Sequence, residues 1–99
     1  MFIDRDRWLA SRLDRGDLYM VRRLFEDAGN APDAALAAKL LAATERGLAD
    51  QRWRDDRSQA VGLRLKGEIL EATGAIKPAI ESYDKAIALN PKIGIKRRV

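Results

Sequence analysis

Apolar side chains recur every three or four residues along most of this chain, and no segment alternates apolar and polar side chains long enough for a strand. The clearest helical pattern covers residues 76–89. Its apolar stripe consists of Ile76, Ala79, Ile80, Tyr83, Ala86 and Ile87. Pro78 fits the first turn of this helix, and Asn90 with Pro91 ends it.

Aspartates mark the starts of three further predicted helices. An aspartate is a favourable cap, because its carboxylate accepts hydrogen bonds from the free N–H groups of the first turn. Asp17 and Asp33 are the expected caps of the first two. For the third, Asp56 and Gln59 have the spacing of a capping box. The predicted helices cover residues 18–28, 33–50 and 57–72, and a shorter one covers residues 5–14.

These elements predict an all-α fold of about five helices in antiparallel hairpins. The 99 residues make one domain, because a division would leave two fragments too short to bury a core. An apolar fraction of 46% with 34% charged residues is typical of a folded chain. The predicted parts are a hairpin over 4–29, a long helix over 33–50, a hairpin over 57–91 and a basic tail over 92–99.

The composition removes most enzyme chemistry. The chain has no Cys and no His, so it lacks disulfides, the commonest zinc ligands and the commonest general base. Its serines have no His to activate them, and no glycine-rich phosphate loop is present. We therefore expect no catalytic, cofactor or metal site. With no apolar run of about 18 residues, and mixed charges at the N-terminus, the sequence predicts a soluble cytoplasmic protein without a membrane partner.

The net charge of +4 arises after residue 60, because acids and bases balance before it. Four bases lie in the last eight residues, namely Lys92, Lys96, Arg97 and Arg98. A protein that follows phosphates usually carries its bases on a folded face, so nucleic-acid binding is the alternative function rather than the first one. In that alternative, Arg52 and Trp53 would join the tail.

Residues 60–93 resemble the tetratricopeptide repeat, a helix-turn-helix unit of about 34 residues that reads Trp, Leu-Gly, Tyr, Ala, Phe and Pro at fixed spacings. The residues that carry the resemblance are Gly67, Gly74, Ala79, Tyr83, Ala86 and Pro91. In the family, the glycine at the position of Gly67 lies where the two helices cross closely. The departures from the pattern are Leu63, Lys66 and Leu70, all in the first helix.

A weaker form of the same pattern lies 58 residues earlier in the chain. It aligns Gly16, Val21, Phe25 and Ala28 with Gly74, Ala79, Tyr83 and Ala86. Because 58 is not a multiple of the repeat length, the helix over 33–50 is an irregular element between two hairpins. The resemblance implies a short right-handed solenoid, and a plain five-helix bundle is the alternative.

Proteins of this family are usually adaptors, so the resemblance implies a non-enzymatic module that binds a peptide or helix of another protein in a groove. By that analogy the groove residues are Val61, Arg64, Glu68 and Glu71. The subclass that clamps a terminal carboxylate is disfavoured, because Glu68 would repel the carboxylate. Alternatively, Arg64 and Glu68 form only an i,i+4 ion pair on a solvated face.

Four aromatic residues and the tail complete the candidate list. Trp53 lies between two arginines and either covers the ends of neighbouring helices or contacts a partner. Trp8, Tyr19 and Phe25 are predicted in the core. The tail is too short to cap the last hairpin, which would leave the apolar outer edge of that hairpin exposed. We therefore expect a homodimer that buries this edge. The apolar residues assigned to self-association are Ile93, Ile95 and Val99.

Overall fold

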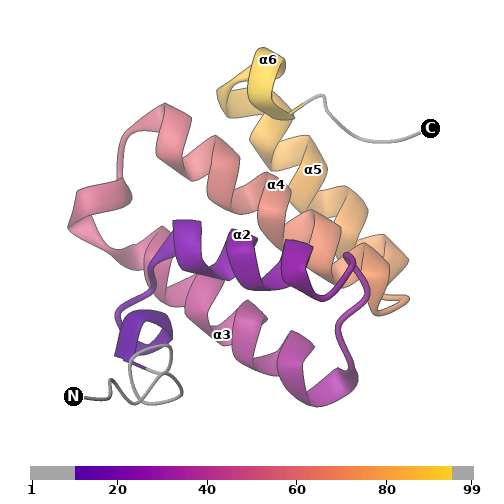
Figure 1. Cartoon of the computed structure of the whole chain (residues 1–99). Coiled ribbons are helices and arrows are strands. Elements are labelled where there is room, and N and C mark those ends of the chain that lie inside the picture. Colours follow the sequence, from indigo (N-terminus) through magenta and orange to yellow (C-terminus); the bar gives the residue numbers. More distant parts are fainter. Residues whose placement is uncertain (1–10, 95–99) are drawn as a thin grey trace.

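Helices joined by short loops make up residues 11–94, the part of the chain that the computed structural model describes (Figure 1). The elements are α2 (Leu18–Asp27), α3 (Ala34–Ala49), the 3-10 helix η1 (Gln51–Trp53), α4 (Asp56–Ala72), α5 (Ile76–Leu89) and α6 (Pro91–Gly94). Residues 11–14 are also helical, whereas most of the predicted helix over 5–14 lies outside the described residues. Residues 11–94 contain no strand, so the all-α prediction is confirmed.

The helices begin where short polar side chains can cap them. Asp17 accepts a hydrogen bond from the Met20 N–H at 3.1 Å, and Asp33 accepts one from the Leu36 N–H at 2.8 Å. Both predicted caps are confirmed. None of the described helices combines the length and the apolar character that a membrane span requires.

The predicted cap of α4 is wrong by one residue. Asp55 is the cap and accepts from the Ser58 N–H at 3.0 Å, while Asp56 lies in the first turn. Gln59 does not complete a capping box, because its amide donates to carbonyl oxygens at the ends of α3 and η1. The acceptors are Leu48 O at 2.9 Å and Trp53 O at 2.6 Å. A tertiary contact has displaced the local one.

Three glycine turns among the described residues have the same backbone geometry. Gly16, Gly29 and Gly74 have positive φ, at 68°, 68° and 86°, a region that glycine enters without a steric penalty. In each turn the glycine N–H bonds to the carbonyl three residues back, and the next N–H bonds to the carbonyl five residues back. The 58-residue offset seen in the sequence aligns the two of these turns that lead directly into a helix, whereas the turn at Gly29 ends α2 and is followed by a loop.

Helix α4 lies at the centre of the packing. It contacts α2 and α3 on one side and α5 and α6 on the other, and Figure 1 shows α2 lying over α3 and α4. The buried core cluster consists of Val21, Phe25, Ala37, Leu40, Ala43, Leu65 and Ile69. The molecule is elongated and flat, with extents of 46 × 29 × 17 Å.

The close crossing predicted at Gly67 is confirmed. A Cβ atom on Gly67 would lie 2.9 Å from Tyr83 Cε1, so the aromatic ring occupies the space that a side chain would need. A second close approach was not predicted: a Cβ atom on Gly47 would lie 2.6 Å from Gly16 O. The first turn and the end of α3 thus meet through their backbones.

Tyr19 is not in the core, contrary to the prediction. Its side chain is 71% exposed, because the buried stripe of α2 consists of Leu18, Val21 and Phe25. Tyr19 lies about 100° around the helix from Leu18, on the outward face. The prediction for Phe25 is confirmed, and Trp8 lies outside the described residues.

Candidate binding groove

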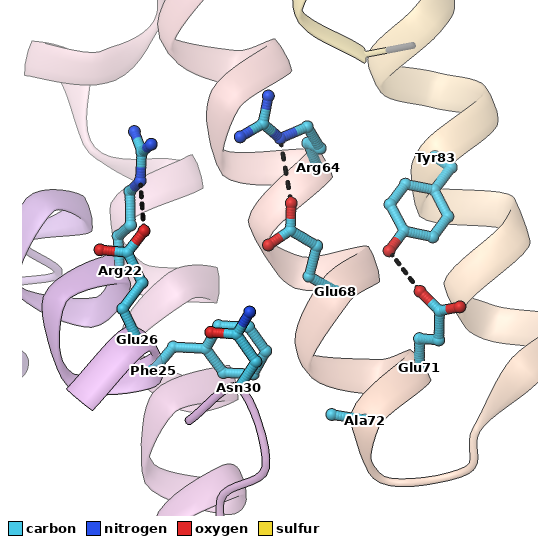
Figure 2. A pocket seen from close by; sticks show the side chains of 9 residues that line it. All are labelled: Arg22, Phe25, Glu26, Asn30, Arg64, Glu68, Glu71, Ala72 and Tyr83. Carbon is cyan, nitrogen blue, oxygen red and sulfur yellow. Dashed lines mark hydrogen bonds and ion pairs between the residues drawn. The ribbon is translucent and has the colours of Figure 1, made fainter. Parts of the chain in front are cut away.

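A cavity of about 390 Å³ lies among α2, α4 and α5 (Figure 2). We call it the α4 groove. Its lining residues are Arg22, Phe25, Glu26, Asn30, Arg64, Glu68, Glu71, Ala72 and Tyr83. Figure 2 shows the α2 residues on one side, Arg64 and Glu68 in the middle and Tyr83 with Glu71 on the other side.

Three of the four residues expected in a groove line this one. Arg64, Glu68 and Glu71 are spaced by three or four residues and therefore share one face of α4. Val61 does not line the groove itself. It borders a smaller adjoining hollow, which Arg22 and Arg64 also line.

Each arginine of the groove is paired with a glutamate one helical turn later. Arg64 Nε donates to Glu68 Oε1 at 3.1 Å, and the two side chains are 18% and 30% exposed. Arg22 Nε lies 3.6 Å from Glu26 Oε2 in a more exposed pair on α2. The i,i+4 ion pair that the sequence offered as an alternative is thus present, and it lies inside the groove.

Glu71 has a different partner from the other two glutamates. Its Oε1 accepts a hydrogen bond from the Tyr83 hydroxyl at 2.8 Å, and no ion pair holds it within residues 11–94. Tyr83 is itself buried with its ring against Gly67. The carboxylate of Glu71 is therefore tied to α5 through the residue that fixes the helix crossing.

The α2 side of the groove was missed by sequence reasoning. Phe25 was expected only in the core; it is buried, and it also lines the cavity. Arg22 and Glu26 carried a local signal, since they are an i,i+4 pair of opposite charge. That signal does not say which helix they face, because the packing of α2 against α4 joins residues about 40 positions apart.

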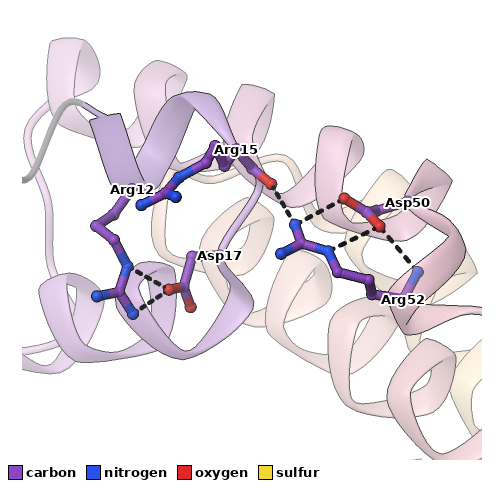
Figure 3. A network of polar contacts seen from close by, with 5 residues as sticks. All are labelled: Arg12, Arg15, Asp17, Asp50 and Arg52. Atoms are coloured by element: carbon purple, nitrogen blue, oxygen red, sulfur yellow. Dashed lines mark hydrogen bonds and ion pairs between the residues drawn. The ribbon is translucent and has the colours of Figure 1, made fainter.

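A second polar cluster connects the turn at Gly16 to the segment that follows α3 (Figure 3). The Arg52 guanidinium donates two hydrogen bonds to the Asp50 carboxylate, from Nε to Oδ1 at 3.1 Å and from a terminal nitrogen to Oδ2 at 2.8 Å. Arg52 also donates to Arg15 O at 3.3 Å, and Arg12 Nε donates to Asp17 Oδ2 at 2.6 Å. The hydrogen bonds from Arg52 lower the pKa of Asp50 to about 2. The exposed Arg52 guanidinium is thus hydrogen-bonded to groups of its own chain.

Trp53 lies in this second region and does not line the α4 groove. Its half-buried ring contacts Tyr19 edge-on, with 5.7 Å between ring centroids, and the Arg52 guanidinium lies 6.0 Å from the ring. The indole Nε1 is buried without a hydrogen-bond partner. Trp53 thus packs back onto the start of α2, which agrees with the expectation that it covers the ends of neighbouring helices.

The candidate tail residues lie mostly beyond the described part. Lys92 is exposed on α6, which packs against α4 and α5. Ile93 belongs to α6, but its side chain is not described. The other tail candidates lie outside the described residues: Ile95, Lys96, Arg97, Arg98 and Val99. Residues 11–94 hold no group of three or more potential metal ligands.

Comparisons of the chain with protein-family models, curated proteins and solved structures give no match.

Proposed function

We propose that this chain is a non-enzymatic protein-interaction module of tetratricopeptide-like hairpins, and that the α4 groove holds a peptide segment or helix of a partner protein. The observation that carries the proposal is the groove itself, where α4 supplies Arg64, Glu68 and Glu71 to one cavity. Its volume of about 390 Å³ lies within the range of about 300–1,000 Å³ that is usual for binding pockets.

The α4–α5 hairpin supports the repeat-like part of the proposal. Gly67 sits at a close helix crossing, and Gly74 forms a tight turn between the helices. The turn at Gly16 repeats that backbone geometry ahead of α2. A repeated helix–turn–helix unit of degenerate repeats would account for the turns at Gly16 and Gly74, whereas the same turn at Gly29 only ends α2.

The chemistry of the groove suits a peptide. A peptide offers one N–H donor and one C=O acceptor per residue along its backbone. The groove presents arginine donors, glutamate acceptors and the amide of Asn30, which does both. Ala72 is exposed and adds apolar surface for a side chain, and the buried rings of Phe25 and Tyr83 form part of the cavity wall. This combination recognises a polar chain with an apolar or amphipathic residue.

The test begins with selection of peptides from a random phage-displayed library on the full chain. The affinity of the best peptide is then measured by fluorescence anisotropy for the wild type and for Arg64→Ala/Glu68→Ala. We expect about tenfold weaker binding or more, because the variant removes charged contacts from the groove. Arg23→Ala/Asp27→Ala is the matched control, since it removes an exposed i,i+4 pair on α2 that does not line the groove.

Two outcomes would contradict the proposal. One is the absence of any selected peptide with micromolar affinity. The other is equal affinity of the wild type and the groove variant, which would move the binding surface elsewhere, with Trp53 and Tyr19 as the next candidates.

The nucleic-acid alternative is tested with labelled duplex DNA in a salt series. Binding through Z phosphates weakens with a log–log slope of about −0.9Z. A steep slope that depends on Lys92, Lys96, Arg97 and Arg98 would favour this alternative. The pairing of Arg52 with Asp50 counts against a role for Arg52, because its guanidinium is already bound.

A further inference from the structure

We infer that the α4 groove selects a basic side chain, a lysine or arginine of the partner peptide, and that the Glu71 carboxylate receives it. This inference rests on the proposed function and specifies its ligand.

The charges of the groove favour a cation. Its charged side chains are three glutamates and two arginines, and the two arginines are paired with Glu26 and Glu68. Glu71 is the remaining carboxylate, and among residues 11–94 its bond comes from a neutral hydroxyl. An incoming cation would bring the formal charge of the site to balance. An anionic ligand would meet an excess of carboxylates and two arginines that are already engaged.

Glu71 is exposed, and a hydrogen bond to one of its carboxylate oxygens orients it before any ligand binds. Tyr83 is 3% exposed, and its hydroxyl holds Oε1 of Glu71 at 2.8 Å. A carboxylate has two oxygens and can accept further hydrogen bonds at both. A pre-positioned acceptor loses little side-chain freedom on binding, which strengthens the contact.

The surfaces around Glu71 suit the rest of a basic side chain. Lysine and arginine carry an apolar stem of three or four carbons below the charged group, and this stem packs on apolar surface. Ala72 and the Tyr83 ring lie beside Glu71 in the cavity wall (Figure 2). Glu68 is three residues earlier on the same face of α4, so a second carboxylate lies nearby.

The decisive variant is Glu71→Gln in the full chain. Glutamine keeps an oxygen that can accept the Tyr83 hydroxyl, so the hairpin is preserved while the negative charge is lost. The matched control is Glu81→Gln, the same change at an exposed position of α5 outside the groove. The probes are the peptides selected in the library screen, each synthesised with its basic residue or with neutral norleucine at that position.

We expect the selected peptides to share a lysine or arginine. Replacement of that residue by norleucine should weaken binding to the wild type about tenfold, and Glu71→Gln should weaken the basic peptide by a similar factor. Glu71→Gln should then bind the two peptides about equally, and Glu81→Gln should behave as the wild type.

The failures of the two proposals are distinguishable. If peptides bind and depend on Arg64 and Glu68 but show no preference for a basic residue, the function stands and this inference is overturned. The same holds if Glu71→Gln still prefers the basic peptide. If no peptide binds the groove at all, the proposed function itself fails.

Discussion

Gly67 has no side chain at the point where α4 crosses α5, and the Tyr83 ring fills that space. Leucine favours helix over glycine by nearly 1 kcal/mol, so propensity alone would stabilise Gly67→Leu. The clash with Tyr83 dominates, and we expect a loss of about 1–3 kcal/mol or more in the free energy of unfolding. Denaturant unfolding measures it. Ala88→Leu at an exposed position of α5 is the control, and a more stable Gly67→Leu protein would contradict the crossing.

The hydrogen-bonded ion pair of Arg52 with Asp50 predicts that the stability of the fold depends on pH. The pKa of Asp50 is about 2 in the folded chain and about 3.9 when unfolded. The carboxylate therefore stabilises the fold above pH 4, and this contribution disappears as the pH falls from about 4 to 2. Hydrogen bonds from Ser58 also lower the pKa of Asp55, so protonation of Asp55 at low pH also reduces the stability of the fold.

Asp50→Asn should reduce this acid-dependent loss. Thermal unfolding of both proteins between pH 2 and 5 is the measurement, with Asp84→Asn on the exposed face of α5 as the control. Parallel curves for the wild type and Asp50→Asn would contradict the assigned role of the Asp50–Arg52 pair.

At the scale of the helix, the cap of α4 separates two adjacent aspartates. Asp55 bonds to the Ser58 N–H, whereas Asp56 lies in the first turn and only its charge favours the helix. Loss of a capping side chain costs about 0.5–2 kcal/mol, and loss of a first-turn charge costs about 0.3–1 kcal/mol. Asp55→Ala should therefore destabilise more than Asp56→Ala in denaturant unfolding. The reverse order would restore Asp56 as the cap.

Helix positions were well predicted because their signals are local. Asp17 and Asp33 as caps, and the 76–89 pattern, rest on residues a few positions apart, and the observed helices begin at the predicted places. Gln59 and Tyr19 escaped prediction for the opposite reason. Gln59 is engaged by carbonyls of Leu48 and Trp53, and the exposure of Tyr19 depends on which face of α2 meets its neighbours.

For the whole molecule, the α4 half of the groove could be predicted and the α2 half could not. Arg64, Glu68 and Glu71 followed from the repeat pattern and its helical spacing. The opposing wall of Arg22, Glu26 and Asn30 depends on how α2 docks on α4, and no local pattern encodes that contact.

The exposed apolar residues of α5 bear on self-association, which remains a proposal. Ile76 and Ile80 lie one helical turn apart on α5 and are 52% and 41% exposed, so they form an apolar edge on one face of that helix. Two such edges can bury each other about a twofold axis, so we expect a dimer at micromolar concentrations. Sedimentation equilibrium of the wild type and Ile80→Asp checks this, with the variant shifted toward monomer. A wild-type monomer would contradict the expected dimer. A dimer that Ile80→Asp does not weaken would contradict the role of α5 and leave the interface with the tail residues Ile93, Ile95 and Val99.

NMR of the full chain shows whether a partner peptide lies in the α4 groove. Backbone amide chemical shifts are followed while a library-selected peptide is added. We expect the largest changes on residues of α2, the following turn and the second half of α4, namely Arg22, Glu26, Asn30, Arg64, Glu68, Glu71 and Ala72. Changes confined to the surroundings of Tyr19 and Trp53, or to α6, with the groove amides unmoved, would contradict binding in the groove.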